Sequence, residues 1–350
     1  MSVPGKKSLS IFRIRNVLIP VFIGFSVTLF FILKDFNKTD FQDIHWCKHC
    51  FIWIIVAILM ECIRDLAYMY RIWLLTDKKI TFKRSFFVIM LWEFASAVTP
   101  TIVGGTAAAL YIVNREGIKM GKTTAIVLIT AILDELFFIL IVPLLFLFIS
   151  QEVLFVNSEF QFLGSDFDTR SLFLIGYIII LCITSFFLYG IFINPGKIKK
   201  TLLQIFKLPF LRKWRDAAGR TGDDIIITSK ELKTKPFVFW IKAFIATVGS
   251  WLARYLTVNF LILAFISTND QLIIIARQLI MWVILLVTPT PGSSGVAEFG
   301  FMIFLGEFLP HGLSSSIALL WRILSYYPYI IIGGMILPAW LRRVYKKEPK

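Results

Sequence analysis

The chain has 350 residues, of which 57% are hydrophobic, and phenylalanine alone contributes 35. This balance excludes an ordinary soluble enzyme and predicts an all-α polytopic membrane protein, because several apolar runs approach the ~20 residues that cross about 30 Å of hydrocarbon. The net charge of +15 does not indicate nucleic-acid binding, since no basic-aromatic nucleic-acid module is visible and basic loops mark the cytoplasmic face of membrane proteins.

Full membrane spans are predicted for the uninterrupted apolar runs. In chain order these lie at about 17–33, 51–70, 123–149, 171–193, 237–266 and 316–340. No small-residue cleavage site follows the first run, so we expect a retained span rather than a signal peptide. The whole of residues 1–350 is interpreted as a single integral domain of six full spans and two interrupted segments.

The segment HWCKHC precedes the second run. It places Cys47 and Cys50 beside His45 and His49, so a metal or redox site is one interpretation. The order does not match c-type haem attachment, and short Cys/His clusters are weak motifs. Four cysteines in the whole chain are too few for a disulfide scaffold. We expect a solvated loop that enters an interfacial helix, with no metal site and no cofactor.

Two further apolar stretches, 85–112 and 272–305, are interrupted in their middles. The interruptions share the sequence VTPT followed by two glycines: Thr99, Pro100, Thr101, Gly104 and Gly105 in the first, and Thr288, Pro289, Thr290, Gly292 and Gly295 in the second. Proline removes a backbone donor and glycine has poor helix propensity. We therefore predict two re-entrant helical hairpins, whose broken backbone is tolerated only where protein or a wet cavity surrounds it.

The loop charges support this topology. If each interrupted stretch enters and leaves on one side, the loops of one face are all net positive: 1–16, 71–84, 113–122, 194–236 and 341–350. The loops of the other face are neutral or net negative: 34–50, 150–170, 267–271 and 306–315. The positive-inside rule then places both termini in the cytoplasm, with the chain in the cell (cytoplasmic) membrane. A simple span at 85–112 would instead move the basic segment 194–236 outside.

The basic segment 194–236 has two interpretations. It contains KIKKTLLQIFKLPFLRKW, in which apolar and basic residues alternate. Such a segment can lie in the interface and attract anionic lipid. An ordinary solvated linker between two halves of the chain is the alternative.

The two VTPT segments have similar surroundings. Each has an arginine upstream and a charged residue downstream, at spacings that agree within one residue: Arg64 and Asp134 for the first, Arg254 and Arg322 for the second. The charge-derived topology gives these units opposite orientations. We therefore predict inverted-topology repeats over about 51–149 and 237–340, an architecture typical of transporters. The freed N–H groups at the breaks would meet a polar or anionic group.

Ionisable residues within the apolar segments are the candidate site residues. They are Glu61, Arg64, Asp65, Glu93, Asp134, Glu135, Lys242, Arg254, Arg277, Glu298 and Arg322. An intramembrane charge is costly and faces a cavity or a partner. Lys242 can snorkel to the interface, Arg277 can lie at the outer interface, and Arg64 can form a bridge with Glu61.

A functional role is favoured for the deepest of these charges and for those beside a break. These residues are Arg64, Glu93, Arg254, Glu298 and Arg322. The alternative is that they lock the two hairpins together.

TPTIVGGTAA (99–108) and TPTPGSSGVAEF (288–299), in a polytopic chain, resemble the membrane domain of lysylphosphatidylglycerol synthases and of the flippase-like proteins built on that domain. The resemblance covers nearly the whole chain. It implies movement of polar lipids between leaflets, including aminoacylated phosphatidylglycerol, with the two breaks and Glu298 lining the site. The synthases carry a soluble aminoacyl-transferase domain after the membrane part, whereas this sequence reaches Lys350 directly after its last span. We therefore expect a stand-alone member that is not a synthase.

The leading hypothesis is a lipid translocase whose partners are membrane phospholipids, anionic or aminoacylated. Arginines would hold the phosphate by bidentate bonds, while Glu298 or Glu93 would hold an amine or carry a proton. No Walker motif is present, so transport would be passive or driven by a gradient. A small-solute or ion transporter and an intramembrane enzyme acting on lipid headgroups are the alternatives. No catalytic residues are assigned, and a homodimer is left open.

Overall fold

The computed structural model describes residues 48–99, 102–156, 159–162, 165–207, 212, 215–287, 296–309 and 313–345. The predicted span at 17–33 and both chain ends lie outside these residues. The described part is helical apart from one two-stranded hairpin. Four helical segments are long and apolar enough to cross a membrane: Met120–Phe148, Thr169–Ile193, Phe237–Phe265 and Leu313–Val344. They coincide with four of the predicted spans.

The first part of the bundle consists of four helices. In chain order they are α4 (Lys48–Leu75), α5 (Phe82–Val98), α6 (Ile102–Arg115) and α7 (Met120–Phe148). The helix α4 extends past the predicted span at 51–70, so Arg71 lies within a helix and not in the basic loop predicted at 71–84. The charge is tolerated there because a carboxylate on α7 pairs with it.

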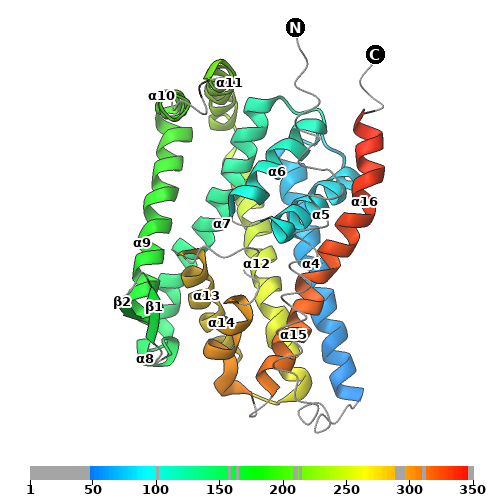
Figure 1. The fold of residues 1–350 in the computed structure, drawn as a ribbon, viewed down its shortest axis with the longest axis vertical. Helices are drawn as coiled ribbons and strands as arrows, with labels where there is room; N and C mark the ends of the chain where they lie inside the picture. The colour runs from blue at the N-terminus through cyan, green and yellow to red at the C-terminus, as the bar shows by residue number, and fades with distance from the viewer. Residues whose placement is uncertain are drawn as a thin grey trace.

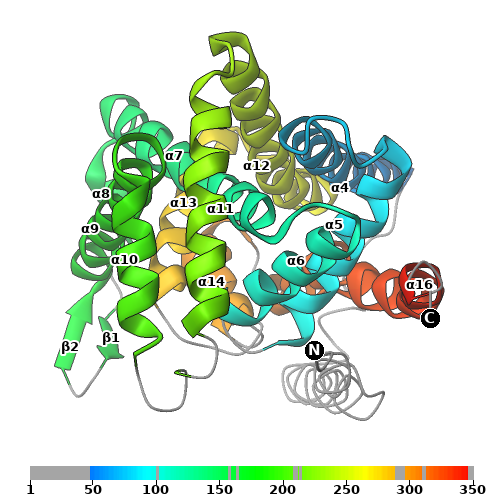
Figure 2. The same cartoon turned by 90° about the horizontal axis from the view of Figure 1, so that it is seen from above.

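The middle of the chain joins the two halves. It contains α8 (Gln151–Leu154), β1 (Glu159–Phe162), β2 (Ser165–Asp168), α9 (Thr169–Leu188), a π-helical turn at Tyr189–Ile193, α10 (Pro195–Ile205) and α11 (Arg215–Lys233). The strands β1 and β2 pair antiparallel and add a short hairpin to the expected all-α fold. The basic segment 194–236 forms α10 and α11, which lie side by side across one end of the bundle (Figures 1 and 2).

The second part repeats the arrangement of long and short helices. It contains α12 (Phe237–Phe265), α13 (Gln271–Val287), α14 (Val296–Leu305), a 3-10 turn at Gly306–Phe308, α15 (Leu313–Ser325) and α16 (Tyr327–Tyr345). In Figure 1 the pair α5–α6 occupies the upper half of the bundle and the pair α13–α14 the lower half. The long helices α4, α7 and α12 run past both pairs.

The helix ends follow from local sequence. Thr99 is extended, with φ −101° and ψ 136°, and its hydroxyl donates to Ala95 O at 2.5 Å. The residue before a proline avoids the helical region, so Pro100 explains why α5 stops there. The second VTPT begins at Val287, the last residue of α13. Between α15 and α16 the break comes at Pro328, which is tolerated in the first turn of a new helix.

Two apolar cores fill the bundle. One lies among α7, α9 and α12–α15 and includes Phe137 and Trp251. The other lies among α4, α5, α7, α11 and α16 and includes Leu133 and Tyr329. On α7, Asp134 falls between these two sets, and on α4 the residues from 61 to 65 do the same. Charged side chains therefore gather at one level, where the two cores meet.

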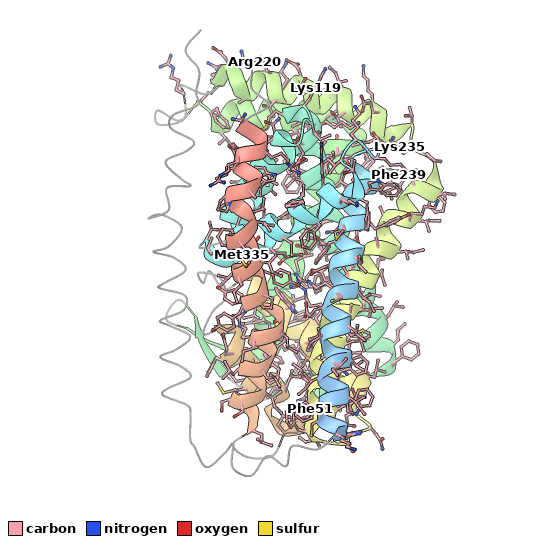
Figure 3. All side chains as sticks on the ribbon, turned by 90° about the vertical axis from the view of Figure 1, so that its right-hand side faces the viewer. Phe51, Lys119, Arg220, Lys235, Phe239 and Met335 are labelled. Carbon is pink, nitrogen blue, oxygen red and sulfur yellow. The ribbon has the colours of Figure 1, made fainter. Side chains whose placement is uncertain are left out.

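The outer surface has the character of a lipid-facing wall. Met335 is 74% exposed and Phe237 77% exposed. Figure 3 shows Met335 on the side of the bundle, whereas Lys119, Arg220 and Lys235 gather near the end that carries α10 and α11. Apolar side walls with a basic end are the pattern expected of a protein that crosses a membrane.

A small ionic cluster fastens the basic end. Asp77, in the loop after α4, accepts hydrogen bonds from Lys122 at 2.7 Å and from Lys235. Partial burial opposes ionisation of Asp77, but the two lysines hold the pKa of this carboxyl below its usual value. The cluster ties the α4–α5 loop to the start of α7 and to the α11–α12 junction.

Two adjacent glycines on α16 provide a test of the packing. A Cβ at Gly333 would lie 2.7 Å from Cγ of Phe94 on α5, whereas a Cβ at Gly334 meets nothing within 4 Å. We expect Gly333→Ala to lower the free energy of unfolding by about 1–3 kcal/mol, as overpacking does. Gly334→Ala should be neutral or stabilising by up to ~1 kcal/mol, because alanine favours a helix. Thermal unfolding of both purified variants measures this, and equal melting temperatures would contradict the close α5–α16 packing.

Candidate functional site

The centre of the bundle holds two ionic clusters built on α4. Glu61, Arg64, Tyr68 and Arg71 recur at helical spacing and are all buried. Residues three and four apart share a helix face, so α4 presents one polar stripe to its neighbours. Tyr68 lies between the two arginines, with its ring 5.4 Å from the Arg64 guanidinium and 4.8 Å from that of Arg71.

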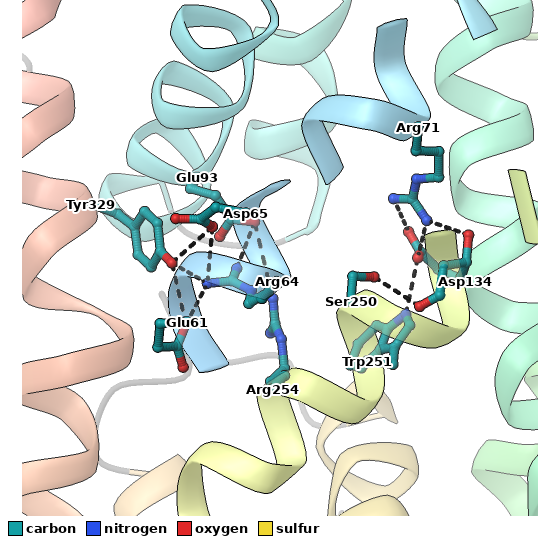
Figure 4. A network of polar contacts seen from close by, with 11 residues as sticks. Glu61, Arg64, Asp65, Arg71, Glu93, Asp134, Ser250, Trp251, Arg254 and Tyr329 are labelled. Carbon is teal, nitrogen blue, oxygen red and sulfur yellow. Dashed lines mark hydrogen bonds and ion pairs between the residues drawn. The ribbon is translucent and has the colours of Figure 1, made fainter. Parts of the chain in front are cut away.

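The first cluster surrounds Arg64, which is only 2% exposed. Its Nη1 donates to Glu61 at 3.1 Å and to the Tyr329 hydroxyl at 2.5 Å. Its Nη2 lies 2.8 Å from Glu93 Oε1 on α5, and its Nη1 lies 3.9 Å from Asp65 Oδ1. Figure 4 shows these groups converging from α4, α5 and α16. We call this set, together with Arg254, the Arg64 cluster.

The second cluster pairs Arg71 with Asp134 on α7. The two side chains form a fork, with bonds of 2.6 Å and 3.1 Å. Thr247 accepts a further bond from Arg71 at 2.9 Å, and Trp251 donates to Asp134 at 2.9 Å. Bidentate pairs of this kind are strong and directional, so the Arg71–Asp134 pair connects α4, α7 and α12.

A polar cavity of about 100 Å³ lies between the clusters. Its lining comes from α4, α5 and α7: Tyr68, Arg71, Ile72, Ile89, Trp92, Glu93, Thr130 and Asp134. Glu93 belongs to the Arg64 cluster and Asp134 to the other, so the cavity joins both. Its size and polar wall suit several ordered water molecules.

Arg254 is held differently from the other deep arginines. Arg64, Arg71, Arg277 and Arg322 lie 2.6–2.8 Å from a carboxylate oxygen. The guanidinium of Arg254 lies 4.0 Å from Glu93 and sits over the rings of Trp251 and Trp282, at 4.9 Å and 5.3 Å. Its Nε lacks a hydrogen-bond partner among the described residues. The hydrogen-bonding capacity of this guanidinium is therefore not fully used within the described part of the chain.

Glu298 and Arg322 form a fork of their own. Arg322 Nε donates to Glu298 at 2.7 Å and Nη2 lies 3.4 Å from the other carboxylate oxygen. The pair connects α14 to α15. Tyr326, whose ring lies 4.7 Å from the Arg322 guanidinium, donates to Ala97 O at 2.9 Å. This contact reaches the last turn of α5 and links the second half of the chain to the first break.

The described part of the first break is closely packed. Thr99 caps α5 through its bond to Ala95, and a Cβ at Gly105 would lie 3.1 Å from Cβ of Ser96. Gly105 therefore allows α6 to approach α5. Gly104 is in the first turn of α6. Several predicted site residues lie outside the described residues: Pro100, Thr101, Thr288, Pro289, Thr290, Gly292 and Gly295.

Sequence reasoning missed three groups at the centre. Arg71 was assigned to a loop, although its spacing of two helical turns from Arg64 is a signal that could have placed it on the same face. Tyr329 comes from α16, 265 residues away along the chain from Arg64. Trp251 lies three residues before Arg254, but a tryptophan in an apolar run carries no signal of its own.

Arg277 binds the carbonyls of Val153 and Phe304 as well as Glu307.

Comparison with known proteins places the chain among membrane proteins. A family model described as the lysylphosphatidylglycerol synthase TM region matches residues 17–333. The chain is also similar to a UPF0104 membrane protein of Archaeoglobus fulgidus, with 25% identity over 296 residues that cover 81% of this chain and 84% of the relative. No solved structure matches the chain. The family match confirms the resemblance inferred from the two VTPT segments.

The Arg71–Asp134 pair predicts an asymmetric response to substitution. Arg71→Met or Asp134→Leu alone leaves the partner charge buried and unpaired, so each should lower stability by about 3–5 kcal/mol. The double variant removes both charges and should recover much of this loss. Thermal unfolding of the three purified variants measures the coupling. If the losses simply add in the double variant, the pair does not act as a unit.

Proposed function

The chain belongs to the family of lysylphosphatidylglycerol synthase transmembrane regions, and on that premise we propose that it moves a polar phospholipid between the leaflets of the cell membrane. The headgroup enters the polar layer between the two apolar cores, while the acyl chains stay in the surrounding lipid. The bound partners are anionic or aminoacylated phospholipids.

Arg254 carries this proposal. Its side chain is 19% exposed, and its guanidinium lies over the rings of Trp251 and Trp282 and 4.0 Å from Glu93. A guanidinium held by aromatic faces keeps its planar edge free, and two parallel N–H groups match the oxygens of a phosphate. The neighbouring carboxylate Glu93 suits an amine on an aminoacylated headgroup. One arginine beside one acid can therefore hold both ends of such a headgroup.

The directions of the helices support access from both leaflets. In Figure 1, α4 rises and α7 descends around α5–α6, whereas α12 descends and α15–α16 rise around α13–α14. We interpret the short pairs as re-entrant hairpins of inverted-topology repeats. Inverted repeats with interrupted helices near the midplane are typical of transporters that open alternately to each side.

The charge distribution supports one orientation. Lys119, Arg220 and Lys235 lie at the end that carries α10 and α11 (Figure 3), and the C-terminal end of α16 lies at the same end in Figure 1. By the positive-inside rule this end faces the cytoplasm, as does the end of α16. On this interpretation α10 and α11 lie against the inner leaflet, where anionic lipid attracts basic segments.

Substitution of Arg254 tests the assignment. Arg254→Lys keeps the charge and removes the planar fork, and Arg254→Ala removes both. We expect Arg254→Lys to slow lipid movement about tenfold or more, because a hydrogen bond to a charged group contributes about 1.5–3 kcal/mol. The measurement is the rate at which fluorescent phosphatidylglycerol in proteoliposomes becomes accessible to a membrane-impermeant quencher.

Arg343→Lys is the matched control, because Arg343 pairs with Glu116 at the basic end and lies outside the polar layer. It should leave lipid movement unchanged. Unchanged movement in both Arg254 variants would contradict the proposal. So would a large loss of thermal stability with a normal rate per folded molecule, since Arg254 would then be structural. Movement of free phosphate or amino acid without lipid movement would favour a solute transporter.

A further inference from the structure

The Tyr329 hydroxyl makes three short contacts inside the Arg64 cluster. Arg64 Nη1 donates to it at 2.5 Å. The same oxygen lies 3.2 Å from Glu61 Oε2 and 3.0 Å from Asp65 Oδ1. Figure 4 shows the tyrosine pointing from α16 toward these three side chains of α4. The two carboxyl groups and the guanidinium thus meet at one oxygen atom.

The hydrogens at this point do not suffice if both carboxyl groups are ionised. A phenol has one hydrogen to donate and can accept with its remaining lone pairs, whereas an ionised carboxylate only accepts. Tyr329 can donate to Glu61 or to Asp65, and the other contact would then place two acceptors about 3 Å apart with no hydrogen between them. One additional proton, carried by either carboxyl group, donates to Tyr329 and satisfies every contact.

The balance of charges in the cluster also indicates one additional proton. The cluster contains three acids, Glu61, Asp65 and Glu93, and two bases, Arg64 and Arg254. Glu61 is 7% exposed and Arg64 2% exposed, so little solvent reaches the Arg64–Glu61 pair at the centre of the cluster. Complete ionisation would leave one net negative charge in the centre of the bundle, where an unpaired charge is costly. One proton makes the cluster neutral.

The groups that face Asp65 come from several elements. Arg64 and Glu61 lie on its own helix, Glu93 faces it from α5 and Tyr329 from α16. Arg254 on α12 acts through Glu93, which Arg71 also approaches from the other cluster. The remaining oxygen of Glu61, Oε1, is buried and has no hydrogen-bond partner among the described residues. An ionised Glu61 would therefore leave one charged oxygen buried without a donor, which is costly.

We propose that Glu61, Asp65 and Tyr329 form a proton-binding site, and that proton uptake and release at this site drive the lipid movement proposed above. The coupling runs through Glu93, which lies 2.8 Å from Arg64 and 4.0 Å from Arg254. When an anionic headgroup occupies Arg254, the positive charge available to Glu93 is reduced, and the cluster gains affinity for a proton. By linkage the bound proton strengthens headgroup binding equally.

The proposed step is balanced in charge. One headgroup carrying one negative charge and one proton bind together, so the polar layer keeps its net charge. Both are then released on the opposite side. The inference rests on the proposed function for its transport part, whereas the presence of the proton can be measured without transport.

Infrared spectra of the purified full-length protein at neutral pH measure the proton directly. A protonated carboxyl group gives a carbonyl band that shifts in D2O, and we expect one such band to disappear in Asp65→Asn and in Glu61→Gln. Glu152→Gln, at an exposed carboxyl group on α8, is the control and should retain the band. Bands from other protonated acids cancel in the difference spectra. Identical spectra of wild type and both variants would overturn the proton site.

Proteoliposomes with an imposed pH difference measure the coupling. With one proton per lipid, the leaflet ratio of fluorescent phosphatidylglycerol should shift by up to about tenfold per pH unit, toward the alkaline side. A protonophore should abolish the shift, and Asp65→Asn should leave the ratio insensitive to pH. Lipid movement in the wild type with no response to the pH difference would overturn the coupling and leave the proposed function standing.

The two experiments distinguish failure of the proposed function from failure of the proposed proton-binding site. If the wild type moves no lipid under any condition, the proposed function fails, while the infrared spectra still decide the proton site. The wild-type response to pH needs no variant, so misfolding of Asp65→Asn would not remove the test. Glu61→Gln provides a second, independent substitution in the same site.

Discussion

Charged groups in hydrocarbon have to be neutralised, and the two ionic clusters on α4 do this at the centre of the bundle. Arg64 and Arg71 place two positive charges between the apolar cores, and each forms an ion pair with a carboxylate on another helix. An unpaired buried charge is strongly destabilising, whereas a satisfied network is tolerated. The positions of α5, α7, α12 and α16 against α4 are therefore constrained by charge as well as by apolar packing.

The same constraint separates the arginines that pair closely with acids from Arg254, which does not. The guanidinium groups of Arg71, Arg277 and Arg322 form bidentate or several short hydrogen bonds. These bonds fix helices and loops in place. Arg254 is held by two aromatic faces and a distant acid. An aromatic face fixes the position of a guanidinium without using its hydrogen-bond donors. On the proposed function, anion binding and stability of the fold fall to different residues.

Glu93 connects these roles. It lines the central cavity, bonds to Arg64 and lies near Arg254. A change of charge at either arginine alters the electrostatic field at the other through this one carboxylate. Because the cluster lies inside the bundle, such changes are screened less than at the protein surface. The geometry offers a physical link between Arg254, the proposed headgroup site, and the carboxyl groups beside Arg64, the proposed proton site, which would let an ion gradient act on the proposed lipid movement.

The sequence alone predicts the membrane class, four of the spans, the positions of both helix breaks and the family. Apolar run length, Thr-Pro pairs and loop charge are local signals, so they can be read from sequence without knowing the neighbours of each residue. It also identified Arg64, Glu93, Asp134 and Arg254 as candidates, because a charge in an apolar run is conspicuous. The hydrogen-bond and ion-pair partners of these side chains could not be predicted from the sequence. Tyr329 meets Arg64, and Trp251 meets Asp134, only after helices distant in sequence pack together. Which arginines form short ion pairs with carboxylates depends on distances of a few ångströms between helices, so these pairs are fixed only when the helices pack together.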